Sequence, residues 1–194
     1  MDFILHSKLD GDYLEFGVYK GTTFIAAYNF ARSVGLKSMK FYAFDSFQGL
    51  PEISSADNNK LHEFSKGQYY CDVDEFKKNI YRRGVNLDRV NIIPGWYDQV
   101  LNEQTKSKIR IKKASIVYID CDLYKSTVPV LNFITDYIQD GTIIIFDDWF
   151  CFKGDPNYGE QKAFREWLKR NPKIVVTEFH KFGWHGNSFI IHLN

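Results

Sequence analysis

Apolar and polar positions alternate along the chain in two patterns, one typical of strands and one typical of helices. Short apolar runs that predict strands occupy residues 13–16, 40–44, 90–93, 114–119, 142–146, 173–179 and 188–192. Amphipathic runs that predict helices occupy residues 22–34, 74–83, 99–104, 127–139 and 160–170. Strands that alternate with helices indicate a mostly parallel sheet with helices on both faces.

The last two apolar runs have no helix between them. They are joined by Gly183-Trp184-His185-Gly186-Asn187, which looks like a hairpin connection and makes the last strand antiparallel. We therefore expect an α/β fold, a Rossmann-like seven-stranded sheet that is mostly parallel and has an antiparallel last strand. The length of 194 residues fits a single domain over residues 1–194.

The first predicted strand runs into a glycine turn and then into a helix, through Glu15-Phe16-Gly17-Val18-Tyr19-Lys20-Gly21-Thr22. This unit is typical of nucleotide-binding α/β domains. A dinucleotide fingerprint needs glycines at positions 17, 19 and 22, but Tyr19 and Thr22 stand at two of them. A turn that has a carboxylate and no pyrophosphate cradle favours S-adenosylmethionine as the ligand. An ordinary strand–turn–helix without a ligand is the alternative.

The composition narrows the class of partner. The net charge is +1 and the charges are well mixed, so no nucleic-acid footprint is present. No apolar run approaches the ~18 residues that span a bilayer, so we expect no membrane association. The three cysteines have no metal-type spacing and are interpreted as reduced thiols of a cytoplasmic protein. A small-molecule partner is the remaining expectation.

Acidic residues follow the predicted strands at the sheet edge where ligands bind in open α/β folds. Asp45 follows the second strand, where its carboxylate can accept both hydroxyls of a ribose. Its alternative role is to cap the turn that it begins.

Asp120, Asp147 and Asp148 follow the fourth and fifth predicted strands, which should be neighbours in the sheet. Neighbouring strands lie ~4.8 Å apart, so these carboxylates should crowd together and repel one another. A hard divalent cation such as Mg²⁺ would relieve the repulsion. Alternatively, Asp147 or Asp148 caps a following helix, and Asp122 caps the helix predicted near residue 127.

Five motifs occur in order along the chain. They are Glu15-Phe16-Gly17-Val18-Tyr19-Lys20-Gly21, Asp45-Ser46-Phe47-Gln48-Gly49-Leu50-Pro51, Pro94-Gly95-Trp96, Asp120-Cys121-Asp122-Leu123-Tyr124-Lys125-Ser126-Thr127 and Asp147-Asp148. Over residues 12–192 the chain resembles the macrocin O-methyltransferase (TylF-like) family of class I, metal-dependent enzymes that use S-adenosylmethionine. The resemblance implies a Rossmann-like sheet, Mg²⁺ and methylation of a hydroxyl, often on a sugar of a natural product or polysaccharide.

The resemblance also implies roles for individual residues. The metal ligands would be Asp120, Asp147 and Asp148. The cofactor site would comprise Glu15, Gly17, Tyr19, Gly21, Thr22 and Asp120, with the ribose on Asp45 and the adenine near Ser46, Gly95 and Trp96. Related catechol-type enzymes have a lysine three residues after the first metal aspartate, but Leu123 stands there in this chain.

The expected reaction is a direct displacement in which a substrate hydroxyl attacks the sulfonium methyl group. Asp120 or Asp122 would accept the hydroxyl proton as general base. Residues 52–72 and the aromatic residues after Asp148 are expected to shape the acceptor pocket, although the aromatic residues could equally belong to the core. The alternatives are a nucleotide-dependent oxidoreductase of Rossmann type and a methyltransferase with a non-sugar acceptor. A homodimer is possible.

Overall fold

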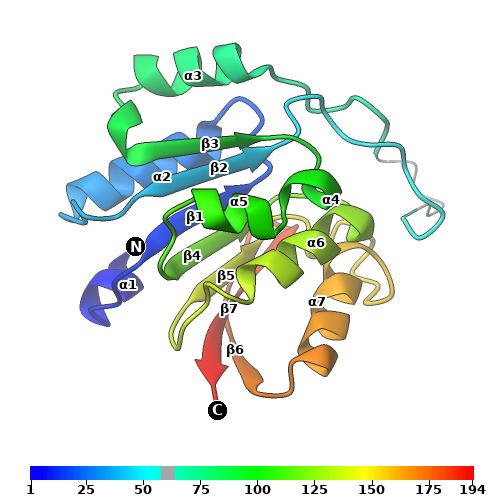
Figure 1. The fold of residues 1–194 in the computed structure, drawn as a ribbon. Coiled ribbons are helices and arrows are strands. Elements are labelled where there is room, and N and C mark those ends of the chain that lie inside the picture. Colours follow the sequence, from blue (N-terminus) through cyan, green and yellow to red (C-terminus); the bar gives the residue numbers. More distant parts are fainter. Residues whose placement is uncertain (58–63) are drawn as a thin grey trace.

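The computed structural model describes residues 1–57 and 64–194, and its centre is a seven-stranded sheet of order β3-β2-β1-β4-β5-β7-β6 (Figure 1). The strands are β1 (Asp12–Phe16), β2 (Phe41–Asp45), β3 (Val90–Pro94), β4 (Ala114–Ile119), β5 (Ile143–Phe146), β6 (Ile174–Phe182) and β7 (Gly186–Leu193). β1 to β5 pair in parallel, and β7 pairs antiparallel with both β5 and β6. The predicted Rossmann-like sheet with an antiparallel last strand is confirmed.

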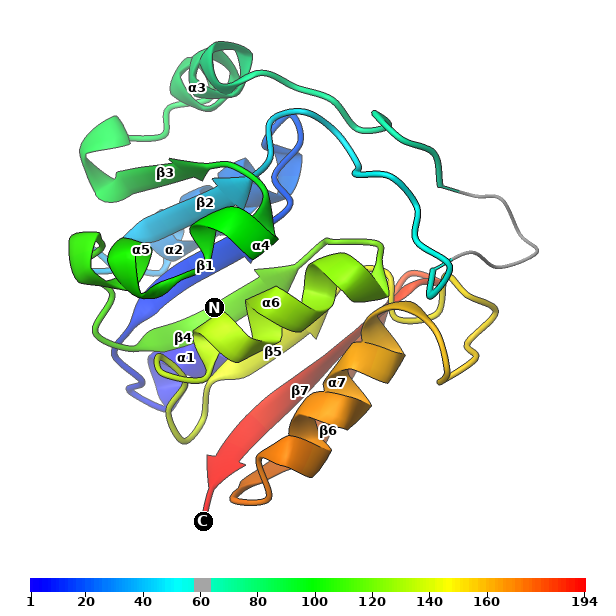
Figure 2. The same cartoon turned by 45° about the vertical axis from the view of Figure 1, so that its right-hand side comes forward.

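Helices cover both faces of the sheet (Figure 2). The longer helices are α2 (Thr22–Ser33), α3 (Val73–Arg82), α6 (Tyr124–Ile134) and α7 (Gly159–Arg170), and the shorter ones are α1 (Asp2–His6), η1 (Leu87–Arg89), α4 (Tyr97–Val100) and α5 (Glu103–Lys108). Along the described part of the chain, no helix combines the length and apolar character that crossing a membrane requires.

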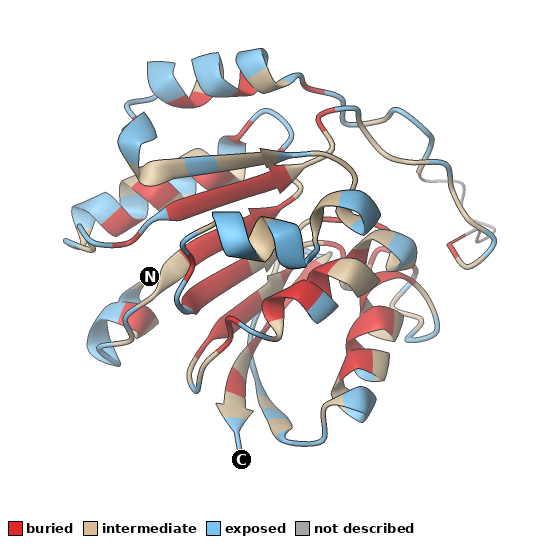
Figure 3. Cartoon of the chain, in the orientation of Figure 1, coloured by how far each residue is buried: buried red, intermediate tan, exposed pale blue. Residues whose placement is uncertain are grey.

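The alternation of side chains along β1 divides the core into two layers. Leu14 and Phe16 pack with the inner sides of α6 and α7, whereas Tyr13 packs with residues of α2 and α3. Both layers contain many aromatic side chains, which accounts for the high Phe and Tyr content without a ligand. The central strands β1, β2 and β4 are buried along most of their length, as Figure 3 shows.

The structure corrects the limits of two predicted helices. α6 begins at Tyr124 instead of residue 127, which puts Pro129 in its second turn, and the helix ends at Ile134 instead of residue 139. The helix predicted over residues 99–104 is two short helices, α4 and α5. Asn102 separates them because its side chain caps α5 by accepting a hydrogen bond from the Thr105 N–H at 3.0 Å.

The start of α6 depends on a residue that is distant in sequence. Leu123 at its N-cap offers no side-chain acceptor, and Asp57 accepts hydrogen bonds from the N–H groups of Tyr124, at 2.5 Å, and Lys125, at 3.3 Å. Asp57 lies in the long connection between β2 and α3, which reaches across toward α6 and α7 (Figure 2). Asp122 is therefore not the cap of this helix.

Candidate active site

A cavity of about 350 Å³ opens at the carboxyl ends of β1, β2, β4 and β5, the edge where ligands bind in open α/β sheets. Its walls come from the glycine turn after β1, from both ends of the β2–α3 connection, from α4, from the turns after β4 and β5, and from the first half of α6. The lining residues are Gly17, Tyr19, Asp45, Ser46, Gly49, Leu50, Pro51, Tyr69, Trp96, Tyr97, Asp98, Gln99, Asp120, Cys121, Asp122, Lys125, Ser126, Pro129, Asp147 and Asp148.

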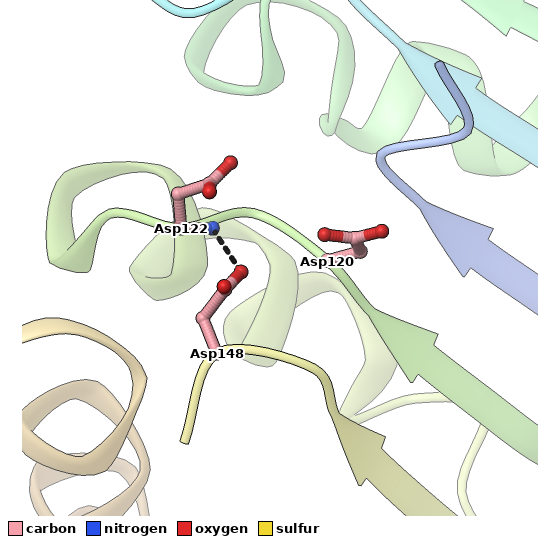
Figure 4. A group of neighbouring side chains, drawn as sticks. All are labelled: Asp120, Asp122 and Asp148. Atoms are coloured by element: carbon pink, nitrogen blue, oxygen red, sulfur yellow. Dashed lines mark hydrogen bonds between the residues drawn. The ribbon is translucent and has the colours of Figure 1, made fainter. Parts of the chain in front are cut away.

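Three carboxylates converge in this cavity. Asp120, Asp122 and Asp148 each offer an oxygen, and the three oxygens lie within 4.8 Å of one another (Figure 4). The backbone explains the convergence, since β4 and β5 are parallel neighbours with Ile119 opposite Phe146. The Asp122 N–H also donates to the Asp148 Oδ2 at 3.2 Å.

The electrostatics of this three-acid cluster favour a cation. Burial raises the pKa of Asp120 and of Asp122 well above the usual range, and the neighbouring carboxylates raise it further. Burial raises the pKa of Asp148 to about 6, although the thiol of Cys151 donates a hydrogen bond that opposes the shift. The donor set contains only carboxylate oxygens, which fits a hard divalent cation such as Mg²⁺.

Asp147 lies beside the three-acid cluster and is held differently. Its carboxylate accepts a hydrogen bond from the hydroxyl of Tyr118 and lies 3.4 Å from Nδ1 of His185, a residue of the β6–β7 hairpin. The cluster therefore combines two of the predicted ligands, Asp120 and Asp148, with Asp122. Neither Asp147 nor Asp148 caps a helix, because α7 begins only at Gly159 and has no side-chain cap.

The glycine turn is pressed against the acids. Gly17 has φ +88°, and a Cβ built on it would lie 1.8 Å from the carbonyl oxygen of Asp120. Only glycine allows β1 to end in direct contact with the end of β4. The Asp120 N–H continues this contact by donating to the carbonyl oxygen of Phe16 at 2.8 Å.

Asp45 connects two turns at the end of β2. Its Oδ1 accepts from the Phe47 N–H at 2.7 Å, which confirms its capping of its own turn. Its Oδ2 accepts from the N–H groups of Val18, at 2.8 Å, and Tyr19, at 3.2 Å. Asp45 thus fixes the glycine turn and also lines the cavity, where a carboxylate oxygen retains capacity for a ribose hydroxyl.

The remaining residues of the predicted cofactor site divide into two groups. Tyr19, Ser46 and Trp96 line the cavity, whereas Glu15, Gly21, Thr22 and Gly95 are not among its lining residues. Gly21, with φ +86°, packs against Phe76 and Ile80 of α3, and Thr22 faces a separate groove between α2 and α3.

Glu15 is a buried acid near the carboxyl end of β1, a central strand of the sheet. It is 1% exposed and accepts a hydrogen bond from the hydroxyl of Tyr13 at 2.5 Å. Burial raises the pKa of Glu15 to about 8, although the hydrogen bond from Tyr13 opposes this shift.

The structure also locates the segments expected to shape the acceptor pocket. Leu50 and Pro51, just before residues 52–72, and Tyr69 within them line the cavity, and residues 58–63 lie outside the described part. Trp149 packs against Phe146 and Phe189 with ring centroids 4.9 and 4.8 Å apart, so it belongs to the core.

Sequence reasoning missed two buried acids that support the site. Asp57 lies in a polar stretch with no motif around it. Glu160 of α7 accepts a hydrogen bond from the Asp148 N–H at 3.0 Å. Its sequence signal was available, because Glu160 is the acidic member of the otherwise apolar stripe Ala163, Phe164 and Trp167.

Two known O-methyltransferases are similar to this chain in sequence. The 8-demethyl-8-(2,3-dimethoxy-alpha-L-rhamnosyl)-tetracenomycin-C 4'-O-methyltransferase of Streptomyces olivaceus is 27% identical over 155 residues, which cover 77% of this chain and 57% of that protein. Mycinamicin III 3''-O-methyltransferase of Micromonospora griseorubida is 28% identical over 151 residues, 75% of this chain and 58% of that protein. The chain thus spans little more than half the length of these relatives.

A solved structure and a family profile also match this chain. The solved structure of the O-methyltransferase NovP has a TM-score of 0.82 at 20% identity, over 97% of this chain and 75% of that chain, which is a likeness of fold. The profile of the family described as Macrocin-O-methyltransferase (TylF) matches residues 1–176. Since this match extends over most of the 194 residues, the chain belongs to the macrocin O-methyltransferase (TylF) family.

Proposed function

We propose that this protein transfers the methyl group of S-adenosylmethionine to a hydroxyl group of a saccharide or of a glycosylated small molecule, with Mg²⁺ at the carboxylates of the cavity. One observation carries the proposal. The cluster of Asp120, Asp122 and Asp148 shares a single cavity with the glycine turn after β1. Family membership supports methyl transfer, and the rhamnosyl group in the name of the Streptomyces olivaceus relative supports a sugar acceptor.

The proposed cofactor position follows the lining of the cavity. Gly17 and Tyr19 would lie under the cofactor, Asp45 would bind the ribose, and Ser46 and Trp96 would flank the adenine. Burial raises the pKa of Asp45, and hydrogen bonds from three N–H groups oppose this shift and favour its ionised form. An ionised Asp45 is a strong acceptor for ribose hydroxyls.

The proposed metal ligands are Asp120 and Asp148, with one further carboxylate. Asp122 is the third by proximity, and Asp147 is the third by resemblance to the family. When bound, S-adenosylmethionine would supply an electrophilic methyl group and Mg²⁺ would stabilise negative charge on the attacking oxygen.

The protein's own contribution is positioning and proton transfer. Asp120 or Asp122 would accept the proton of the substrate hydroxyl. The glycine turn after β1 contacts Asp120 through Gly17. A methyl donor bound over this turn would therefore lie next to the acids, in line with the hydroxyl of the methyl acceptor. Leu50, Pro51 and Tyr69 would cover the acceptor.

The first test is ligand preference. Calorimetric titration should detect binding of S-adenosylmethionine and none of NADPH, and the reverse preference would favour the oxidoreductase alternative. The second test offers the protein a panel of rhamnosides, nucleotide sugars and sugar-free phenols with S-adenosylmethionine. Methylation confined to the phenols would refute the saccharide assignment while leaving methyl transfer in place.

A further inference from the structure

Glu160 is a buried acid that the proposed reaction does not use. It is the second residue of α7 and is 1% exposed. Its Oε2 accepts a hydrogen bond from the Asp148 N–H at 3.0 Å. Its Oε1 is fully buried and has no hydrogen-bond partner among the described residues.

The rest of the helix face makes Glu160 unusual. Ala163, Phe164 and Trp167 follow it at helical spacing, and all are buried in the layer between α7 and the sheet. An acid on such a face, with one oxygen unpaired, costs stability relative to an apolar side chain. Space filling alone therefore gives no reason for a carboxyl group at this position.

The contacts of Asp148 supply a reason. Its N–H is held by Glu160, its Oδ1 accepts from the thiol of Cys151 at 3.1 Å, and its Oδ2 accepts from the Asp122 N–H at 3.2 Å. These three contacts fix both the main chain and the carboxylate of Asp148. Among them, only the contact with Glu160 links Asp148 to a long helix, and Trp167 anchors that helix in the core at 0% exposure.

We propose that Glu160 is a positioning residue for the divalent cation site. By holding the Asp148 main chain against α7, it keeps the Asp148 carboxylate close to those of Asp120 and Asp122. Residues that orient metal ligands in this way tune metal affinity without touching the ion. The proposal rests on the metal part of the proposed function.

The test measures metal affinity directly, with Mn²⁺ as the probe and electron paramagnetic resonance as the readout of free ion. Glu160→Met keeps the length of the side chain and removes the acceptor. Glu160→Gln keeps a carbonyl oxygen for the Asp148 N–H. Glu166→Gln is the matched control, because Glu166 lies on the same helix and accepts its hydrogen bond from Tyr124 instead.

We expect Glu160→Met to weaken Mn²⁺ binding about 10-fold or more. Glu160→Gln and Glu166→Gln should bind Mn²⁺ close to the wild-type affinity, and all three should bind S-adenosylmethionine as the wild type does. Rescue by Gln separates positioning from a general structural role. Circular dichroism and thermal unfolding check each variant, and if Glu160→Met does not fold, Glu160→Ala replaces it.

Each other outcome has a defined meaning. If the folded Glu160→Met or Glu160→Ala variant binds Mn²⁺ with wild-type affinity, the positioning role of Glu160 is overturned and the proposed function is unaffected. An equal loss in Glu160→Gln overturns the hydrogen-bond account, since the charge would then matter. Absence of Mn²⁺ binding by the wild type overturns this inference together with the metal part of the proposed function, and the titration with S-adenosylmethionine still tests the rest.

Discussion

A Cβ on Gly17 would lie 1.8 Å from the main-chain carbonyl oxygen of Asp120, so the glycine turn after β1 is in direct contact with the main chain of the acid cluster. This relationship predicts that Gly17→Ala both strains the turn and pushes the two strand ends apart. Gly35→Ala is the matched control, because Gly35 has a similar φ of +83° with no atom within 4 Å of its Cβ position.

We expect Gly35→Ala to cost about 1–2 kcal/mol of unfolding free energy, from the left-handed conformation alone. Gly17→Ala should cost about 1–3 kcal/mol more because of the clash, and it should also weaken the binding of S-adenosylmethionine. Urea unfolding and calorimetry measure the two effects. Equal stability of the two variants would contradict the close contact.

Replacing metal ligands should separate metal binding from folding. Asp120→Asn and Asp148→Asn should each weaken Mn²⁺ binding by at least about 10-fold, because each removes a charge from an all-carboxylate site. Asp136→Asn is the control, since Asp136 is an exposed acid that pairs with Lys106. Asp122→Asn and Asp147→Asn then identify the third ligand, and retention of affinity in both Asp120→Asn and Asp148→Asn would refute the site.

The buried acids predict that the unfolding free energy of the metal-free protein falls as the pH rises. Burial raises the pKa of Glu15 from 4.5 to about 8, so the folded state holds this proton more tightly than the unfolded state. The stabilisation is present below pH 4.5 and is lost as the pH rises toward 8. In EDTA, the unfolding free energy should therefore fall between pH 5 and pH 8, by on the order of a few kcal/mol.

Glu15→Gln tests whether Glu15 causes this loss, because the amide cannot ionise. Its unfolding free energy should depend less on pH over the same interval. If the metal-free wild type instead gained stability from pH 5 to pH 8, Glu15 would be ionised in the folded state and the assignment would be wrong.

Asp57 couples the β2–α3 connection to α6. Asp57→Ala should cost about 1 kcal/mol, the usual loss for a helix cap. Asn86→Ala is matched to it, because Asn86 caps η1 through the N–H group of Asp88 and lies outside the β2–α3 connection. Both variants should lose similar stability. Only Asp57→Ala should also raise the KM for the acceptor, since Tyr69 of the same connection lines the cavity; equal KM values would show that the connection does not bear on the acceptor.

Local periodicity predicted the sheet because its signals are short-range. The apolar run at residues 114–119 coincides with β4, and the hairpin residues before β7 correctly implied the change of strand direction. The limits of α6 could not be predicted in the same way, because its first N–H groups bond to Asp57, which lies 67 residues before Tyr124.

The site was partly predictable for a topological reason. Carboxyl ends of neighbouring parallel strands share one edge, which is why Asp120 and Asp148 were expected to meet. Asp122 in the cluster has a φ of +59°, a conformation that is uncommon for a residue other than glycine and that no local sequence pattern predicts. Glu160 was missed because its partner is the main-chain N–H of Asp148, 12 residues earlier, which no side-chain motif marks.

The most direct measurement of the central claim is the relaxation of the methyl protons of S-adenosylmethionine by protein-bound Mn²⁺, followed by nuclear magnetic resonance. If the glycine turn and the acids form one site, the wild type should broaden the methyl signal strongly, and Asp148→Asn should broaden it far less. Saturating both ligands without any broadening in the wild type would contradict a shared site for methyl donor and cation.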